Sequence, residues 1–287
     1  MTTSAPALEK AAQTAAARPR RIRLGPIVLQ SHLALTFIFL YAPILILVIF
    51  SFNAARQQTV WTGFTFDWYA QMVQDAKAIN AAKNSAIIAV ISTAVSTVIG
   101  TLTALALDRY RFRGRTAFEG AMYLPIIVPE IVMAIALLVF FNFGFGLLEQ
   151  WTKIQLNFGL GTITVAHIAF SFPFVAVVVR ARLADFDRRL EEAAKDLGAN
   201  EWQTFRRVTL PLLMPGILAG ALLAFTLSID DFVITFFTAG VGSTTLPLEI
   251  YGRVRRGVTP EVNAISTVLL LASIALVLGS TLLQRKR

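Results

Sequence analysis

The sequence predicts an all-α, polytopic membrane protein with six transmembrane helices. The 287 residues are 56% hydrophobic and only 15% charged, with a mean hydropathy of +0.65. Because soluble domains are about a quarter charged, this chain has too little polar surface for a water-soluble fold of its size. A helix needs about 20 mainly apolar residues to cross the hydrocarbon layer. Six stretches meet that length, at about 33–52, 85–107, 118–141, 161–179, 213–236 and 264–283.

The distribution of basic residues predicts that both termini are cytoplasmic. The chain has 26 Lys and Arg against 17 Asp and Glu, a net charge of +9. In so apolar a chain we read this excess as a topology signal and expect no nucleic-acid partner. The basic residues gather before the first stretch, between the second and third, between the fourth and fifth, and after the last. The positive-inside rule therefore places these segments, including the long loop 180–212, in the cytoplasm.

The chain is expected to consist of a short arm and one membrane domain. Residues 1–25 are rich in Ala, Thr, Arg and Pro and show no apolar face, which is typical of a disordered basic arm. Residues 26–287 then form the transmembrane domain. Cysteine is absent, and the two histidines lie far apart, so we expect neither a metal site nor a thiol nucleophile. No phosphate-binding loop of the G-x-x-x-x-G-K-[ST] type is present, and we expect no enzymatic activity in this chain.

The long cytoplasmic loop contains signals for two short helices. Asp187 can cap the first helix, and Gly198 suits the left-handed position just past its end. Asn200 and Gln203 have the spacing of a capping box that begins the second helix. That helix must end or bend at Pro211, which lacks a backbone N–H. The loop is therefore predicted to form two short helices that meet at a corner.

One segment of this loop has a more particular spacing. It reads Glu192-Ala193-Ala194, then Gly198, then Val208-x-Leu210-Pro211. This spacing resembles the EAA loop of permease subunits in ABC importers, in which the short helix docks into a cytoplasmic ATPase. Charge alone would also fit an amphipathic loop that its arginines hold at the lipid headgroups. The resemblance implies that the ATPase-coupling residues are Glu191, Glu192, Ala193, Ala194, Asp196, Gly198, Leu210 and Pro211.

The resemblance extends over most of the chain from Asn84 onward. The segments ALDRYRFRG (106–114), PEIVMAIALLV (129–139), FPFVAVVVRARL (172–183), LSIDDFVIT (227–235), LPLEIYG (246–252) and TPEVNAIST (259–267) are similar to the spermidine/putrescine permease subunits of binding-protein-dependent importers. Glu249 departs from the pattern, because relatives often carry a basic residue there. The resemblance implies a type I ABC importer permease fold in the bacterial inner membrane, surrounded by lipid. It also implies a second related permease, an ATPase dimer that uses ATP and Mg²⁺, an extracytoplasmic binding protein, and no cofactor in this chain.

Three carboxylates within the predicted spans are candidates for a cation path. Glu130 is expected near the middle of the third span, and Asp230 and Asp231 in the outer half of the fifth. A charge at the centre of a span costs about 2.5–3.5 kcal/mol on insertion scales, so these residues need a reason to be there. Spaced carboxylates suit the ammonium groups of a polyamine, although each could instead fix helix packing. Two residues adjacent on a helix point about 100° apart, and we expect Asp231 to face the path.

Other polar residues of the spans fit either a path or helix packing. Tyr123, Ser171 and Ser228 can contact a cargo, but they can equally bond neighbouring helices. His167 is interpreted as a buried, hydrogen-bonded packing residue in preference to a proton relay. Two other functions stay open: an ion-coupled secondary carrier that uses the three carboxylates, and an ABC permease for a different small solute.

Overall fold

The computed structural model describes residues 24–56 and 60–285, and within them every regular element is helical apart from one antiparallel bridge between Asn53 and Phe64. The predicted arm of residues 1–25 therefore lies almost wholly outside the described residues. Six helices are long and apolar enough to cross a membrane, and this number confirms the sequence prediction. The chain divides into two compact units after Ile49.

The first unit is represented by a single long helix. Helix α2 (Leu24–Phe50) has 27 residues, is apolar around its whole circumference and contains Pro43. The Thr36 hydroxyl donates a 2.9 Å hydrogen bond to the His32 carbonyl one turn earlier, so this polar side chain is satisfied within the helix. The length and composition of α2 are those of a membrane span.

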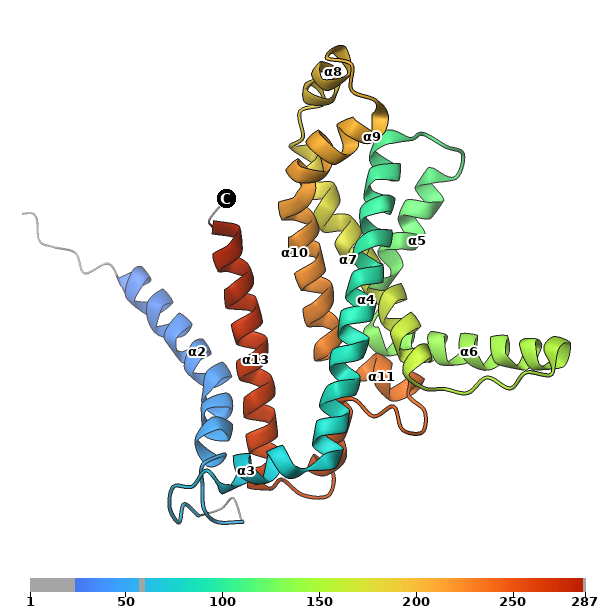
Figure 1. Ribbon diagram of the computed structural model, residues 1–287. Helices are drawn as coiled ribbons and strands as arrows, with labels where there is room; N and C mark the ends of the chain where they lie inside the picture. The colour runs from blue at the N-terminus through green and yellow to red at the C-terminus, as the bar shows by residue number, and fades with distance from the viewer. Residues whose placement is uncertain (1–23, 57–59, 286–287) are drawn as a thin grey trace, which may run out of the picture. The chain divides into compact units, whose positions relative to one another are not determined.

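The second unit contains all the other helices (Figure 1). In chain order these are α3 (Asp67–Gln74), α4 (Ala76–Arg109), α5 (Arg115–Ile127), α6 (Glu130–Thr152), α7 (Leu160–Ala184), α8 (Arg189–Asp196), α9 (Glu201–Thr204), the π-helical turn η1 (Phe205–Thr209), α10 (Leu210–Ile229), α11 (Val233–Thr238), α12 (Leu246–Val254) and α13 (Pro260–Arg285). Figure 1 shows α8 and α9 at one end of this unit and α3 at the opposite end.

Helices α4, α7 and α10 pack against one another and form the centre of the unit. Small residues make this close approach possible, as is common between helices in membranes. A Cβ atom added at Gly100 of α4 would lie 2.7 Å from the Phe172 carbonyl oxygen of α7 and 2.7 Å from Val175 Cβ. A Cβ atom at Gly220 of α10 would lie 3.0 Å from Val175 Cγ1. The two glycines thus let α4 and α10 contact the same stretch of α7.

The third predicted span is not a continuous helix. Helix α5 ends at Ile127, and α6 begins at Glu130 after Val128 and Pro129, both of which have extended ψ angles. Proline cannot donate a backbone hydrogen bond, and it disfavours the helical conformation of the residue before it. Glu130 therefore opens a helix and does not lie near the middle of one. In Figure 1, α6 runs crosswise to α4.

The fifth predicted span is also interrupted. Helix α10 ends at Ile229, and the short helix α11 begins only at Val233. Residues 230–232 are not helical, so the two aspartates lie in a break and not on a continuous helix face. At its other end, α10 continues from α9 through η1, in which the Leu210 N–H bonds the Phe205 carbonyl. This wider turn lets the chain pass into α10 with Pro211 in its first turn.

A substitution at Gly100 tests the packing of α4 on α7. Overpacking a core typically costs about 1–3 kcal/mol, whereas Gly→Ala in an open helix position gains roughly 0.5–1 kcal/mol. We expect Gly100→Ala to lower the melting temperature of the purified chain in detergent. Gly120→Ala in α5, where an added Cβ meets nothing within 4 Å, is the control and should keep or raise it. Equal melting temperatures in the two variants would contradict the close approach.

Candidate functional site

The cytoplasmic loop folds by the local signals that its sequence contains. The Asp187 carboxylate accepts a 3.0 Å hydrogen bond from the Arg189 N–H at the start of α8. Gly198 follows α8 with a φ of 87°, in the left-handed region. Asn200 and Gln203 form the reciprocal capping box at the start of α9, with bonds of 2.9 and 3.0 Å. These local predictions are confirmed.

Glu191, however, faces inward and not toward an external partner. Its carboxylate accepts hydrogen bonds from the Arg109 guanidinium at the end of α4 and from the Thr209 hydroxyl of η1. A second ion pair lies beside it, because Arg188, the residue before α8, donates a 2.8 Å bond to Asp108 of α4. The expectation that Glu191 meets donors on another protein therefore does not fit its position. Helix α8 is instead fastened to the end of α4.

The outer side of the loop is exposed and partly apolar. Glu192, Ala193 and Asp196 are exposed, Leu197 is 90% exposed, and Trp202 is 65% exposed. A groove of about 260 Å³ lies between α8 and α9 and is lined by Ala194, Leu197, Gly198, Ala199, Gln203, Arg207 and Val208. Exposed large apolar side chains around a concave surface are a feature of protein interaction sites.

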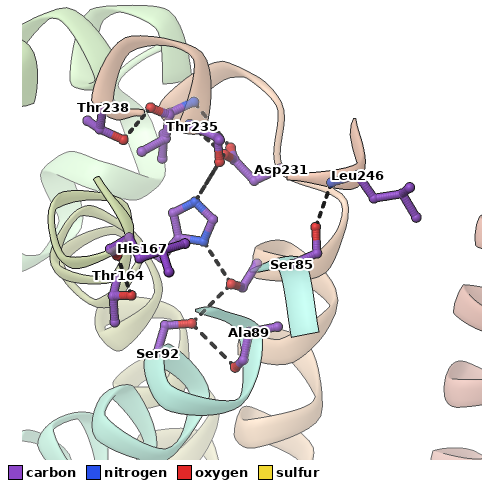
Figure 2. A network of polar contacts seen from close by, with 12 residues as sticks. Ser85, Ala89, Ser92, Thr164, His167, Asp231, Thr235, Thr238 and Leu246 are labelled. Carbon is purple, nitrogen blue, oxygen red and sulfur yellow. Dashed lines mark hydrogen bonds and ion pairs between the residues drawn. The ribbon is translucent and has the colours of Figure 1, made fainter. Parts of the chain in front are cut away.

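A buried polar network joins four helices at the break after α10 (Figure 2). At its centre is His167 of α7, whose side chain is 2% exposed. Its Nδ1 lies 2.7 Å from Ser228 Oγ, and its Nε2 lies 3.1 Å from an Asp231 carboxylate oxygen and 3.1 Å from Thr235 Oγ1. Ser228 Oγ in turn lies 3.0 Å from Ser92 Oγ of α4. The network thus connects α4, α7, α10 and α11.

The two adjacent aspartates occupy opposite environments. Asp231 is buried and accepts bonds from the backbone N–H groups of Ile234 (3.3 Å) and Thr235 (2.8 Å) in the first turn of α11. Asp230 is exposed. The expectation that Asp231 rather than Asp230 faces an open path therefore does not fit the structure. The reason is that the helix ends at Ile229, so Asp231 is free to turn inward and cap α11.

The remaining predicted path residues are only partly brought together. Glu130 is exposed at the start of α6. Ser171 lies one turn beyond His167 on α7, and its buried hydroxyl has no hydrogen-bond partner among the described residues. Tyr123 is separate, because it packs against the apolar cluster around Leu107. Within the described part of the chain, no three His, Asp or Glu side chains are grouped so that they could hold a metal ion.

Another charged cluster lies at the start of α4, apart from the cytoplasmic loop and the network around His167. Arg253 of α12 donates a 2.5 Å bond to Asp75 and a 2.8 Å bond to Glu249. Burial alone would raise the pKa of Asp75, but the Arg253 guanidinium and the N–H groups of Lys77 and Ala78 outweigh it and hold that pKa below its ordinary value. Glu249 thus has a local partner, which gives a physical reason for an acidic residue at this position.

Several residues of these sites escaped the sequence reasoning. Arg109 and Thr209 lie far from Glu191 in sequence, and no spacing rule connects them. Thr235 and Ser92 are ordinary small polar residues in apolar stretches. The burial and hydrogen bonding of His167 agree with its interpretation as a packing residue, but nothing in the sequence indicated that its partner is Asp231.

The family described as "Binding-protein-dependent transport system inner membrane component" matches residues 96–286. The spermidine/putrescine transport system permease protein PotC of Escherichia coli is 42% identical over 264 residues, covering 92% of this chain and 96% of that protein. The putrescine transport system permease protein PotI of the same species is 42% identical over 239 residues, covering 83% and 84%. The chain belongs to the family of binding-protein-dependent transport system inner membrane components.

The fold is shared with solved importer structures. A crystal structure of a bacterial ABC transporter involved in the import of the acidic polysaccharide alginate superposes with a TM-score of 0.77 at 20% identity. The superposition covers 93% of this chain and 96% of that one. At this level of identity the match shows the fold, which is the type I importer permease fold expected from the sequence.

A charge swap tests the attachment of α8 to α4. We expect Asp108→Arg or Arg188→Asp alone to speed chymotrypsin cleavage beside the exposed Trp202 by about two- to fivefold, the range that corresponds to an exposed ion pair. The reason is that each single variant places like charges at the contact. The double variant restores the opposite charges and should return to the wild-type rate. If it is cleaved as fast as the single variants, the two helices are not joined by this pair.

Proposed function

We propose that this chain is the membrane-spanning permease subunit of an ATP-driven importer for polyamines in the bacterial inner membrane, with both termini in the cytoplasm. The observation that carries the proposal is the 42% identity, along 92% of the chain, to a permease of spermidine and putrescine transport. The complete machine would contain a second, related permease, two ATPase subunits that use ATP and Mg²⁺, and an extracytoplasmic binding protein.

The exposed side of the EAA segment supports docking to an ATPase. Leu197 and Trp202 offer apolar area at a helical corner, and Glu192 and Asp196 place carboxylates beside them. Gly198 fixes the corner in a conformation that other residues rarely adopt. Because α8 is fastened to α4 through Glu191, a displacement of this corner reaches a membrane helix directly.

The carboxylates at the α10 break support a cationic cargo. Asp230 is exposed there, and Glu130 is exposed at the start of α6. A polyamine carries ammonium groups separated by short methylene chains, and separate carboxylates can bind separate ammonium groups. Three aromatic residues, Phe232, Phe236 and Tyr251, follow Asp230 in the sequence. The ring centroids of Phe232 and Tyr251 lie 4.5 Å apart, and Phe232 also contacts Phe236. Such rings provide apolar and cation–π surface for methylenes and ammonium groups.

Uptake in a defined system tests the proposed function. We expect proteoliposomes that contain this chain, its second permease and the ATPase to take up labelled spermidine or putrescine only with ATP and binding protein. A protonophore should leave that uptake unchanged. The chain has no cysteine, so Leu197→Cys gives one cross-linking site, which should join the ATPase. ATP-independent uptake that collapses with the protonophore would instead indicate a secondary carrier, and uptake of neither amine would refute the substrate class.

Neutral variants of the exposed carboxylates test the cargo path. We expect Glu130→Gln and Asp230→Asn each to raise the KM for spermidine about tenfold, because each removes one charge-assisted contact worth about 1.5 kcal/mol or more. The control is Glu149→Gln, which changes a carboxyl group at the other end of α6 that bonds Gln155. All three variants should bind the ATPase equally. Wild-type KM in the first two would exclude Glu130 and Asp230 from the path.

A further inference from the structure

The break between α10 and α11 depends on one buried carboxylate. The Asp231 side chain is only 2% exposed, and burying a carboxylate is costly unless it is well hydrogen-bonded. Its oxygens accept from the N–H groups of Ile234 and Thr235 and from the Thr235 hydroxyl at 2.8 Å. These three donors all belong to α11. His167 is the contact that ties the carboxylate to a different helix.

The hydrogen-bond directions around His167 form one consistent chain. If Nε2 carries the proton and donates to Asp231, Nδ1 must accept from the Ser228 hydroxyl at 2.7 Å. Ser228 is then free to accept from Ser92 at 3.0 Å. In this order the imidazole bonds Ser228 and Asp231 at the same time, and Ser228 bonds Ser92. The ring therefore bonds α10 on one side and the cap of α11 on the other.

This arrangement has a consequence for the exposed carboxylate of Asp230. Asp230 is the covalent neighbour of Asp231. Its position therefore depends on where the Asp231 carboxylate is held. A site for a cation needs its ligands fixed within a fraction of an ångström, which requires support from the residues behind them.

We propose that His167 is a positioning residue: its imidazole holds Asp231 in the break between α10 and α11 and thereby presents Asp230 to a cationic cargo. The identity of the cargo in this inference rests on the proposed function, whereas the role of His167 in holding Asp231 does not. His167 itself does not touch the cargo, because its side chain is buried and its polar atoms are all engaged within the chain.

Two substitutions of His167 separate positioning from the alternatives. Gln can donate to Asp231 and accept from Ser228, but it cannot be protonated near neutral pH; Leu fills space but does neither. In the reconstituted importer, we expect His167→Leu to raise the KM for spermidine about tenfold with little change in kcat, and His167→Gln to stay within about threefold of wild type. The tenfold loss corresponds to one hydrogen bond to a charged group.

The other outcomes overturn the proposal. Wild-type KM in both variants means that His167 only fills space, and equal loss of uptake in both means that a titrating imidazole is required. Thr162→Val is the control, because Thr162 also lies on α7 and bonds the Thr238 carbonyl of α11 at 2.7 Å without contacting Asp231. It should leave KM unchanged. If His167→Leu does not fold, Thr235→Val removes a different donor from the same carboxylate at nearly constant volume and should raise KM severalfold.

Amide hydrogen exchange tests the same inference without any cargo. The Ile234 and Thr235 N–H groups bond to Asp231 only while the carboxylate is held in place. We expect a peptide that covers α11 to exchange several times faster in His167→Leu than in wild type, and at the wild-type rate in His167→Gln. Unchanged exchange in His167→Leu would refute the positioning role, whereas failure of polyamine uptake by the wild type would refute only the proposed cargo.

Discussion

The structure of the candidate site depends on how the chain satisfies the N–H groups at the buried start of α11. A helix that starts inside the protein exposes N–H groups without partners, and in an apolar environment each must find an acceptor within the chain. Here the acceptor is the carboxylate of Asp231, two residues before α11 begins. Because a carboxylate in that position must itself be supported, it also bonds the Thr235 hydroxyl of α11 and the imidazole of His167 on α7. His167 in turn bonds Ser228, which bonds Ser92. The need to pair the N–H groups at the start of α11 thus explains the network of hydrogen bonds around Asp231 and His167.

The same helix that contributes Ser92 to this network also reaches both ends of the second unit. Helix α4 has 34 residues and no proline. At one end, Arg109 bonds Glu191 of α8; at the other, the Asn84 amide donates to the Gly242 and Thr244 carbonyls at 3.3 and 2.9 Å. Between them, Gly100 brings α4 into direct contact with α7. The corner between α8 and α9, the buried network and the loop before α12 are therefore attached to one stiff element, which suits the transmission of a rigid-body displacement.

Part of the structure could be predicted from the sequence, because it depends on interactions between residues close together in the chain. The number of spans follows from hydropathy, and the caps at Asp187 and Asn200 and the left-handed Gly198 follow from short-range rules. Pro129 marked the break before α6, but the apolar stretch on both sides of it favoured one span. The break after Ile229 has no proline or glycine to mark it. The inward turn of Glu191 was not predictable either, because it depends on Arg109, which lies 82 residues away.

The two adjacent aspartates show why residue type and position along the chain do not determine a role. Both are acidic residues in an apolar sequence, and the cost of placing a charge there gives each the same reason to be functional. The structure separates them by exposure: Asp230 is exposed, while Asp231 uses its oxygens on the backbone of α11 and on His167. Under the proposed function, a substitution at Asp230 removes a ligand of the cation, whereas one at Asp231 removes the support of that ligand. Only a measurement of local backbone order distinguishes the two causes, since both act on the affinity for cargo.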